Sequence, residues 1–359
     1  MLILTFGSFF YQVYSYRFGY LKKYDPKISE ERYSYSQFNR VGNQIRYILE
    51  DDEVYSWAGY SYLKSPDPTI VNFEHPPLGK ILIGLSIKIF GNEKIIQILW
   101  AVLFLVVLYK LSLSVIQNKT LALVPLIIML WDPLFRDQLR LSLLDLPQVF
   151  FMLWAIYLVI KKNINRRDLL LIGLCLGAVV SIKFFASGII FGAFIYLVLT
   201  SIRKVKIKQL ILPTLIAISI YLISYLGYFL SGHGILDFVM VHFYVLRFYK
   251  DFIPSYPPFE IWRIIMIGEW RVWFGNTEFI KAPAWWIGWP IGVIATIFVI
   301  FYKKLSFLQK IPAIWVMFYL ATNSFHVVFT RYLLTVLPIA YIYFTYLISA
   351  ELGKIKNRK

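Results

Sequence analysis

Long apolar runs separated by short basic segments dominate this sequence. Several runs approach the length of about 20 residues that an α-helix needs to cross a bilayer core about 30 Å thick. Ten spans are predicted, the first weak and the third short: 1–18, 95–116, 120–134, 141–160, 168–183, 185–202, 210–230, 284–302, 311–327 and 331–350. The pattern therefore predicts an all-α polytopic membrane protein, with residues 1–359 forming a single transmembrane domain.

Positive charge gathers in the connections between these spans. Four basic segments stand out, at 161–167, 203–208, 303–310 and in the tail after residue 353. Loops rich in Lys and Arg remain in the cytoplasm, so these segments, the C-terminus included, are predicted to be cytoplasmic in a plasma-membrane protein. Alternation of the spans then places residues 20–94 and 231–282 outside, as two large extracytoplasmic loops.

A shorter apolar stretch, residues 78–90, lies within the first of these loops. Its 13 residues are too few to cross the bilayer core. Lys80, Gly84 and Lys88 would share one face of a helix, at i, i+4 and i+8. The stretch is therefore predicted to be an interfacial helix rather than a span.

Composition supports the membrane assignment. The chain is 59% hydrophobic and only 16% charged, whereas soluble domains are about 45–50% apolar and about 25% charged. The net charge of +17 is explained by orientation in the membrane, so no nucleic-acid partner is expected. The single cysteine, Cys175, excludes an intrachain disulfide and a Cys-based metal site.

An acidic cluster in the first outer loop is the first candidate for chemistry. Asp51, Asp52 and Glu53 are consecutive. Neighbouring carboxylates at a low-dielectric boundary raise each other's pKa, which suits a general base. The same oxygens could hold a divalent cation, so these three are also the candidate metal ligands. A solvated acidic turn is the plain alternative.

The second candidate is a helix start with the sequence His75-Pro-Pro-Leu-Gly-Lys80. Proline favours the first turn of a helix, and the free N–H groups there form an anion site. Lys80 lies one turn further on and could add a positive charge. The segment could thus seat a lipid-linked phosphate, although a lysine that snorkels to the interface would have the same pattern.

Three further cations are predicted at the outer ends of spans: Arg140, Lys183 and Arg331. A cation near the bilayer is costly and often functional, and Arg binds phosphate with two parallel hydrogen bonds. Snorkelling is again the alternative for each one. The histidines show no spacing typical of a zinc site.

These motifs together resemble the protein O-mannosyltransferase family, part of the GT-C class of glycosyltransferases that use lipid-phosphate sugars. The segments DDEVYSWAGYSYL and FEHPPLGKILI are similar to the first outer loop of that family, with Asp52 and Glu53 matching its Asp-Glu pair. WDPLFRDQLRLSLLDLPQVFF is similar to a later family segment, with Arg140 and Asp145 matching and Leu139 in place of the usual serine.

The remaining matches follow in the same order along the chain. GLCLGAVVSIKFFASGIIF places Lys183 at a family lysine. VHFYVLRFYKDFIPSYPPFEIWR is a weaker match, in which His242, Pro257 and Trp262 align. The resemblance implies a GT-C-like bundle of about 10–11 transmembrane helices. The chain has no room for the extra domain that eukaryotic members carry in the second loop.

The resemblance implies transfer of a sugar, mannose in the family, from a polyprenyl or dolichyl phosphate to Ser or Thr hydroxyls of exported proteins, with inversion. Asp52 would be the general base and Glu53 would assist it. The donor phosphate would be held by His75, Lys80, Arg140, Lys183 and Arg331. Asp145, His242 and Trp262 would line the acceptor or sugar site.

No cofactor is required beyond the lipid-linked donor, and a divalent cation is left open. One alternative keeps the fold and transfers the sugar to a lipid or a cell-wall polymer. The other is a transporter or flippase, which would be expected to have paired halves with broken spans. No such halves are visible, and the charges lie at span ends. The oligomeric state is left open.

Overall fold

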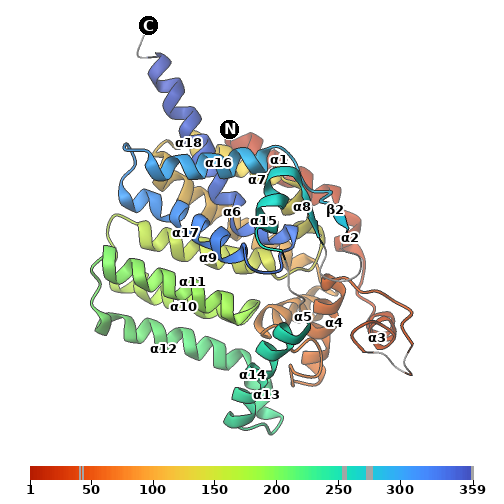
Figure 1. Ribbon diagram of the computed structural model, residues 1–359. Helices are drawn as coiled ribbons and strands as arrows, with labels where there is room; N and C mark the ends of the chain where they lie inside the picture. Colours follow the sequence, from red (N-terminus) through yellow and green to blue (C-terminus); the bar gives the residue numbers. More distant parts are fainter. Residues whose placement is uncertain (40–41, 43, 253–256, 272–277, 357–359) are drawn as a thin grey trace.

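The computed structural model describes residues 1–39, 42, 44–252, 257–271 and 278–356. It is mainly helical and has almost no sheet (Figure 1). The first third of the chain forms α1 (Leu2–Ser15), α2 (Arg17–Leu21), α3 (Pro26–Ser34), α4 (Asp51–Lys64), α5 (Leu78–Phe90) and α6 (Ile95–Ile116). The next part forms η2 (Leu121–Leu123), α7 (Val124–Trp131), α8 (Pro133–Arg140), α9 (Asp145–Ile160), α10 (Arg166–Ile182), α11 (Phe185–Leu197), η3 (Val198–Ile202) and α12 (Ile207–Ser224).

The helix α13 (Leu226–Leu230) follows α12 within the predicted span 210–230. The segment predicted as the second outer loop, 231–282, is also structured and holds α14 (Ile235–Phe252), α15 (Glu260–Ile267) and a two-stranded antiparallel hairpin of β1 (Glu269–Arg271) and β2 (Phe279–Lys281). The chain then ends with α16 (Gly288–Phe301), α17 (Phe307–Asn323), η4 (Thr330–Thr335) and α18 (Leu337–Lys356). The last three residues of the basic tail, 357–359, lie outside the described residues.

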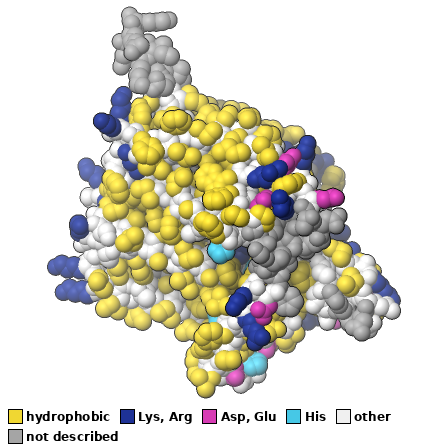
Figure 2. Space-filling model, viewed as in Figure 1, with side chains coloured by type: hydrophobic (Ala, Val, Ile, Leu, Met, Phe, Trp, Pro, Cys, Tyr) yellow, Lys and Arg dark blue, Asp and Glu magenta, His cyan; other side chains and the backbone are white. Residues whose placement is uncertain are grey.

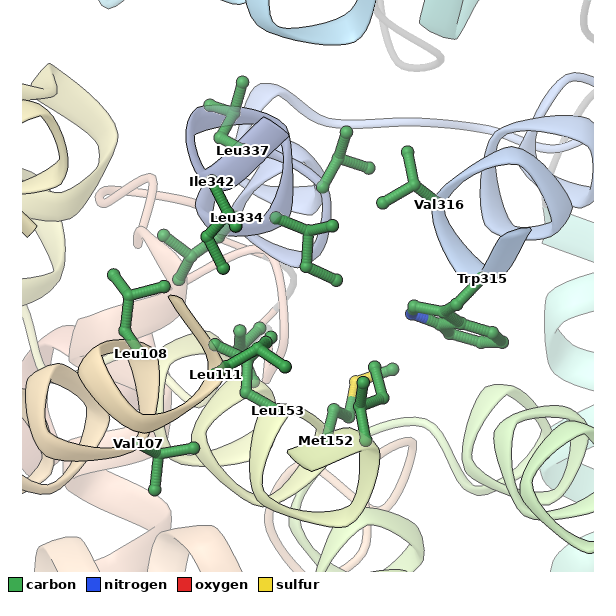
Figure 3. Close-up of a cluster of buried hydrophobic side chains, with 14 of the residues drawn as sticks. Val107, Leu108, Leu111, Met152, Leu153, Trp315, Val316, Leu334, Leu337 and Ile342 are labelled. Atoms are coloured by element: carbon green, nitrogen blue, oxygen red, sulfur yellow. The ribbon is translucent and has the colours of Figure 1, made fainter. Parts of the chain in front are cut away.

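The core lies where α6, α9, α17 and α18 meet (Figure 3). Leu108 and Leu111 from α6 face Leu153 from α9, and Trp315 comes from α17. Small residues let other helices approach closely, as is common in membranes. A Cβ atom on Gly173 of α10 would lie 2.4 Å from a backbone oxygen of α12, so these two helices touch backbone to backbone.

Three helical segments are long and apolar enough to cross a membrane alone: α6, α11 continued by η3, and α12. The pair α8 and α9 passes the same criterion together but is bent by 118°. The other expected spans overlap α1, α7, α10, α16, α17 and α18, but the span expected over 331–350 begins with η4, and α18 starts only at Leu337. Figure 2 shows the hydrophobic surface that these helices present, with Lys and Arg along one edge.

The bend is a finding that the sequence pattern missed. The predicted spans 120–134 and 141–160 leave only a short connection between them, but residues 133–140 form the helix α8. Pro133 occupies its first turn, and the Asp132 carboxylate accepts a hydrogen bond from the Leu134 backbone N–H at 2.9 Å. A capping carboxylate followed by proline starts a helix efficiently, which explains the difference.

The helix predicted over residues 78–90 is present with the expected bounds, as α5. It packs against α4 through two glycines, because a Cβ on Gly84 would lie 2.2 Å from the Gly59 oxygen. The connections α9–α10, α11–α12 and α16–α17 turn on one side of the molecule, whereas α4, α5 and α14 lie on another (Figure 1). Arg203 donates to the Lys162 oxygen at 3.1 Å, which joins two of the basic loops.

Candidate active site

Two carboxylates and two cations from four separate elements meet beside the start of α4. Asp51 is the first residue of α4, Asp145 is the first residue of α9, Lys183 ends α10 and Arg331 lies on η4. We call these four residues the charge cluster. Asp51 and Arg331 are 280 residues apart in sequence, so only the fold brings them together.

Two ion pairs build the charge cluster. The Lys183 ammonium donates to one oxygen of Asp145, and the Arg331 guanidinium donates to Asp51. The Arg331 Nε also lies 3.8 Å from the second oxygen of Asp145. Arg331 Nε and the second Asp145 oxygen are both buried, and neither has a hydrogen-bond partner in the part of the chain that the structure describes. Arg331 therefore lies between the two carboxylates. It donates a hydrogen bond to Asp51 but only approaches Asp145.

Aromatic residues enclose the charge cluster. The Tyr55 hydroxyl, one helical turn after Asp51, donates to the Asp51 carboxylate at 3.2 Å. The Lys183 ammonium lies 4.9 Å from the centre of the Tyr332 ring, which is a cation–π contact. These rings keep water from much of the site, so the electrostatic interactions inside it are strong.

The histidine of the second motif lies beside the charge cluster. Its Nδ1 is 3.3 Å from the Tyr249 hydroxyl of α14, and its ring is close to that of Tyr55. Burial, together with Lys183 and Lys80, lowers the pKa of His75 to about 3. His75 is therefore neutral at physiological pH and can donate or accept a hydrogen bond without adding charge.

Lys80 is fully buried and supports the loop before α5. Its ammonium donates to the Asn72 backbone oxygen at 2.5 Å, to the Asn72 side chain at 3.2 Å and to the His75 oxygen at 2.7 Å. Burial lowers the pKa of Lys80 to about 7. All three hydrogens of the charged form have partners, so Lys80 holds His75 in place instead of presenting a free donor to a phosphate.

The carboxylates of Asp52 and Glu53 have different charged neighbours from the carboxylate of Asp51. Burial raises the pKa of Asp52 to about 6, with Lys94 lowering it and Glu53 raising it. The Glu53 carboxylate pairs with Arg32 at 2.7 Å and also caps the start of α4. Among the described residues Asp52 has no ion-pair partner.

Three other predicted site residues lie apart from the charge cluster. Arg140 pairs with Asp137 at 3.2 Å and lines a separate cavity of about 210 Å³ with Arg136. His242 contacts the Tyr221 hydroxyl at 2.5 Å. The Trp262 indole N–H donates to the Ser324 hydroxyl at 2.9 Å, and residues 253–256 just before it lie outside the described residues.

Sequence reasoning thus found three members of the charge cluster, Asp145, Lys183 and Arg331, and placed Asp51 in the acidic cluster and among the candidate metal ligands but assigned the role of base to Asp52. The spacing of Asp51 and Tyr55, one helical turn apart, was the signal for Asp51. In the described part of the chain, no group of three or more His, Cys, Asp or Glu residues is arranged to hold a metal ion.

Comparison with known proteins confirms the resemblance. Residues 74–228 match the dolichyl-phosphate-mannose-protein mannosyltransferase family. The match includes Asp145 and Lys183, whereas Asp51 and Arg331 lie outside it. No curated protein matches the sequence.

Two solved structures share the architecture. ArnT from Cupriavidus metallidurans in the apo state has a TM-score of 0.60 at 13% identity, covering 85% of this chain and 57% of that one. The same protein bound to undecaprenyl phosphate has a TM-score of 0.61 at 13% identity, covering 83% and 55%. The chain spans little more than half the length of these structures. At this identity the match establishes the fold, which is the GT-C fold of an integral membrane protein.

Proposed function

We propose that this chain is a membrane glycosyltransferase that moves a sugar from a polyprenyl phosphate carrier to a hydroxyl acceptor on the extracytoplasmic side. The charge cluster carries this proposal, because it gathers two cations and two carboxylates at one site in a GT-C fold. The solved structure that holds undecaprenyl phosphate supports a carrier of this class.

The charge cluster suits the leaving group of such a reaction. A sugar phosphodiester carries one negative charge, and its phosphate gains a second as the bond to the sugar breaks. Arg331 and Lys183 would stabilise that developing charge, which is the interaction that most strongly accelerates such steps. A carboxylate at the start of α4 would accept the proton of the attacking hydroxyl, a contribution of about 10²–10⁴-fold.

The finer proposal is that the sugar is mannose and the acceptor is a Ser or Thr hydroxyl of an exported protein. The matching family supports it by its name and by the segment matched. A direct displacement on one face of the sugar would invert the anomeric centre. A lipid or cell-wall acceptor would use the same donor site and would differ only in the product.

A donor screen tests the proposal. The purified full chain in lipid nanodiscs would be given radiolabelled polyprenyl phosphate sugars with Ser/Thr peptides, and the products would be identified by mass spectrometry. Transfer to peptide is expected, and a lysine variant of the site, Lys183→Met, should abolish it. Transfer of the sugar to lipid and not to peptide would show that the acceptor is a lipid and would overturn the proposal of a protein acceptor. Carrier movement across the bilayer without any new glycoside would overturn the enzyme assignment in favour of a flippase.

A labelling experiment tests the orientation. In a Cys175→Ser background, Lys64→Cys places a thiol at the exposed end of α4, and Lys206→Cys places one in an exposed basic loop. A membrane-impermeant maleimide added to intact cells should label only the first. The reverse pattern would place α4 in the cytoplasm and would rule out an extracytoplasmic reaction.

A further inference from the structure

The two neighbouring aspartates at the start of α4 occupy different environments. Successive residues in an α-helix are rotated by about 100°, so Asp51 and Asp52 cannot face the same site. Asp51 accepts hydrogen bonds from Arg331 and Tyr55 inside the charge cluster. The Asp52 carboxylate accepts backbone hydrogen bonds at the start of α4 and feels the charges of Lys94 and Glu53, while its backbone oxygen accepts from Ser56 and Ser142.

The charge cluster has a closed half and an open half. The side chains of Lys183 and Asp145 are 7% and 6% exposed, whereas those of Arg331 and Asp51 are 22% and 32% exposed. Arg331 Nε is buried on the side of Asp145 and has no hydrogen-bond partner among the described residues. An incoming anion would therefore meet the Asp51–Arg331 pair first, and it could accept a hydrogen bond from the Arg331 guanidinium in place of Asp51 without disturbing the Lys183–Asp145 pair.

The charge balance of the site indicates which carboxylate should take the proton of the acceptor hydroxyl. The two carboxylates already neutralise the two cations, so the phosphodiester adds one unmatched negative charge. When the sugar leaves, the phosphate gains another. If the hydroxyl proton moves to a carboxylate of the cluster, the site keeps the same total charge throughout the reaction. If the proton moves to Asp52, the charge cluster with its bound phosphate gains one negative charge during the reaction, which is costly in a partly buried site.

We propose that Asp51 is the catalytic base and that the donor phosphate releases it by replacing it on Arg331. This inference rests on the proposed function. The acceptor oxygen bonds to the anomeric carbon, and the bond from that carbon to the phosphate oxygen breaks with its electron pair on the phosphate. The hydroxyl proton moves to Asp51 and later to water.

The electrostatics of the pair agree with this exchange. Burial alone would raise the pKa of Asp51, but Arg331, His75 and Lys183 outweigh it and hold the pKa below its usual range. A phosphate bound to Arg331 takes over part of that positive charge. Asp51 therefore becomes more basic when the donor is in place, so proton transfer is coupled to donor binding.

Paired variants in the full chain test the proposal. Asp51→Asn should lower kcat at least 100-fold and tighten binding of undecaprenyl phosphate at least fivefold, because Arg331 loses its competitor. Asp52→Asn should lower kcat by a much smaller factor, so that the fold loss of kcat in Asp51→Asn is at least ten times the fold loss in Asp52→Asn. Asp251→Asn, in an exposed surface pair with Arg247, is the matched control and should leave affinity within twofold.

Each outcome decides one point. A larger loss of kcat in Asp52→Asn than in Asp51→Asn would overturn the base assignment, and weaker binding in Asp51→Asn would overturn the exchange. If Asp51→Asn does not fold, Asp51→Glu should bind undecaprenyl phosphate like the wild type and turn over at least tenfold more slowly. The binding arm needs no turnover. A wild type that transfers no sugar would therefore refute the proposed function, while binding still tests the exchange.

Discussion

Two sites in this protein are built around aspartates, and their carboxylates have different kinds of partner. The Asp132 carboxylate, at the break between α7 and α8, accepts hydrogen bonds from Trp286, Trp289 and Tyr341 at 2.9, 3.0 and 2.5 Å. All three donors are neutral and go to one oxygen, while the other oxygen caps α8. The charge cluster instead pairs its carboxylates with cations.

The difference between the two sites lies in what remains unbonded. At Asp132 both oxygens have partners and the residue is fully buried, so no ligand can enter without breaking the bonds. In the charge cluster, Arg331 Nε and one oxygen of Asp145 are unbonded, and the Asp51–Arg331 pair is partly exposed. A fully satisfied network fixes helices in place, whereas the charge cluster keeps polar atoms without partners and an ion pair that a charged ligand could exchange.

The largest effect is expected from removing the cation of the open half. Arg331→Ala should lower kcat/KM for the lipid-linked donor by about 10²–10³-fold, because a donor to the developing charge is lost. Arg247→Ala removes an exposed arginine of α14 and should change kcat/KM less than twofold. Initial rates in nanodiscs measure both. A stable Arg331→Ala protein with full activity would make the charge cluster a purely structural site, like that of Asp132.

An intermediate effect is expected at Asp132, and on stability instead of rate. Asp132→Asn should lower the free energy of unfolding by about 1–3 kcal/mol, because hydrogen bonds to a charged acceptor are lost in a buried site. Activity per folded molecule should stay within about threefold. Thermal unfolding in detergent measures the change, with the half-exposed Asp137→Asn as control. A variant that is stable but inactive would show that the Asp132 site takes part in the reaction.

The smallest effect is expected in the pH profile, which sharpens the assignment of the base. Several charged or titratable groups surround Asp51: Tyr55, Glu74, His75, Asp145, Lys183, Tyr249, Arg331 and Tyr332. His75, with a pKa of about 3, remains neutral from pH 5 to 8.

The base works only when deprotonated, so activity falls as the pH drops through its pKa. The pKa of Asp51 is below the usual range, so kcat/KM should change less than twofold between pH 7 and 6. If Asp52 were the base, its pKa of about 6 would halve kcat/KM near pH 6. Initial rates at constant ionic strength distinguish the two profiles.

Much of the fold could be predicted from the sequence, because helices depend on residues within a few positions of each other. The apolar runs located the long spans, and Gly91 after the short run of residues 78–90 marks the end of α5. The segment 133–140 was missed because its eight residues are strongly mixed in polarity, although Asp132 and Pro133 are a helix-start signal.

For the candidate site, too, the sequence predicted some features and only the tertiary structure decided the others. Residue types and span ends predicted that Lys183 and Arg331 lie near one face of the membrane, and the family resemblance added Asp145. Which of Asp51 and Asp52 faces Arg331, and why Lys80 and Arg140 do not, was decided only by the tertiary structure. These outcomes depend on where helices cross and how they are rotated, and contacts spanning up to 280 residues leave no trace in local sequence patterns.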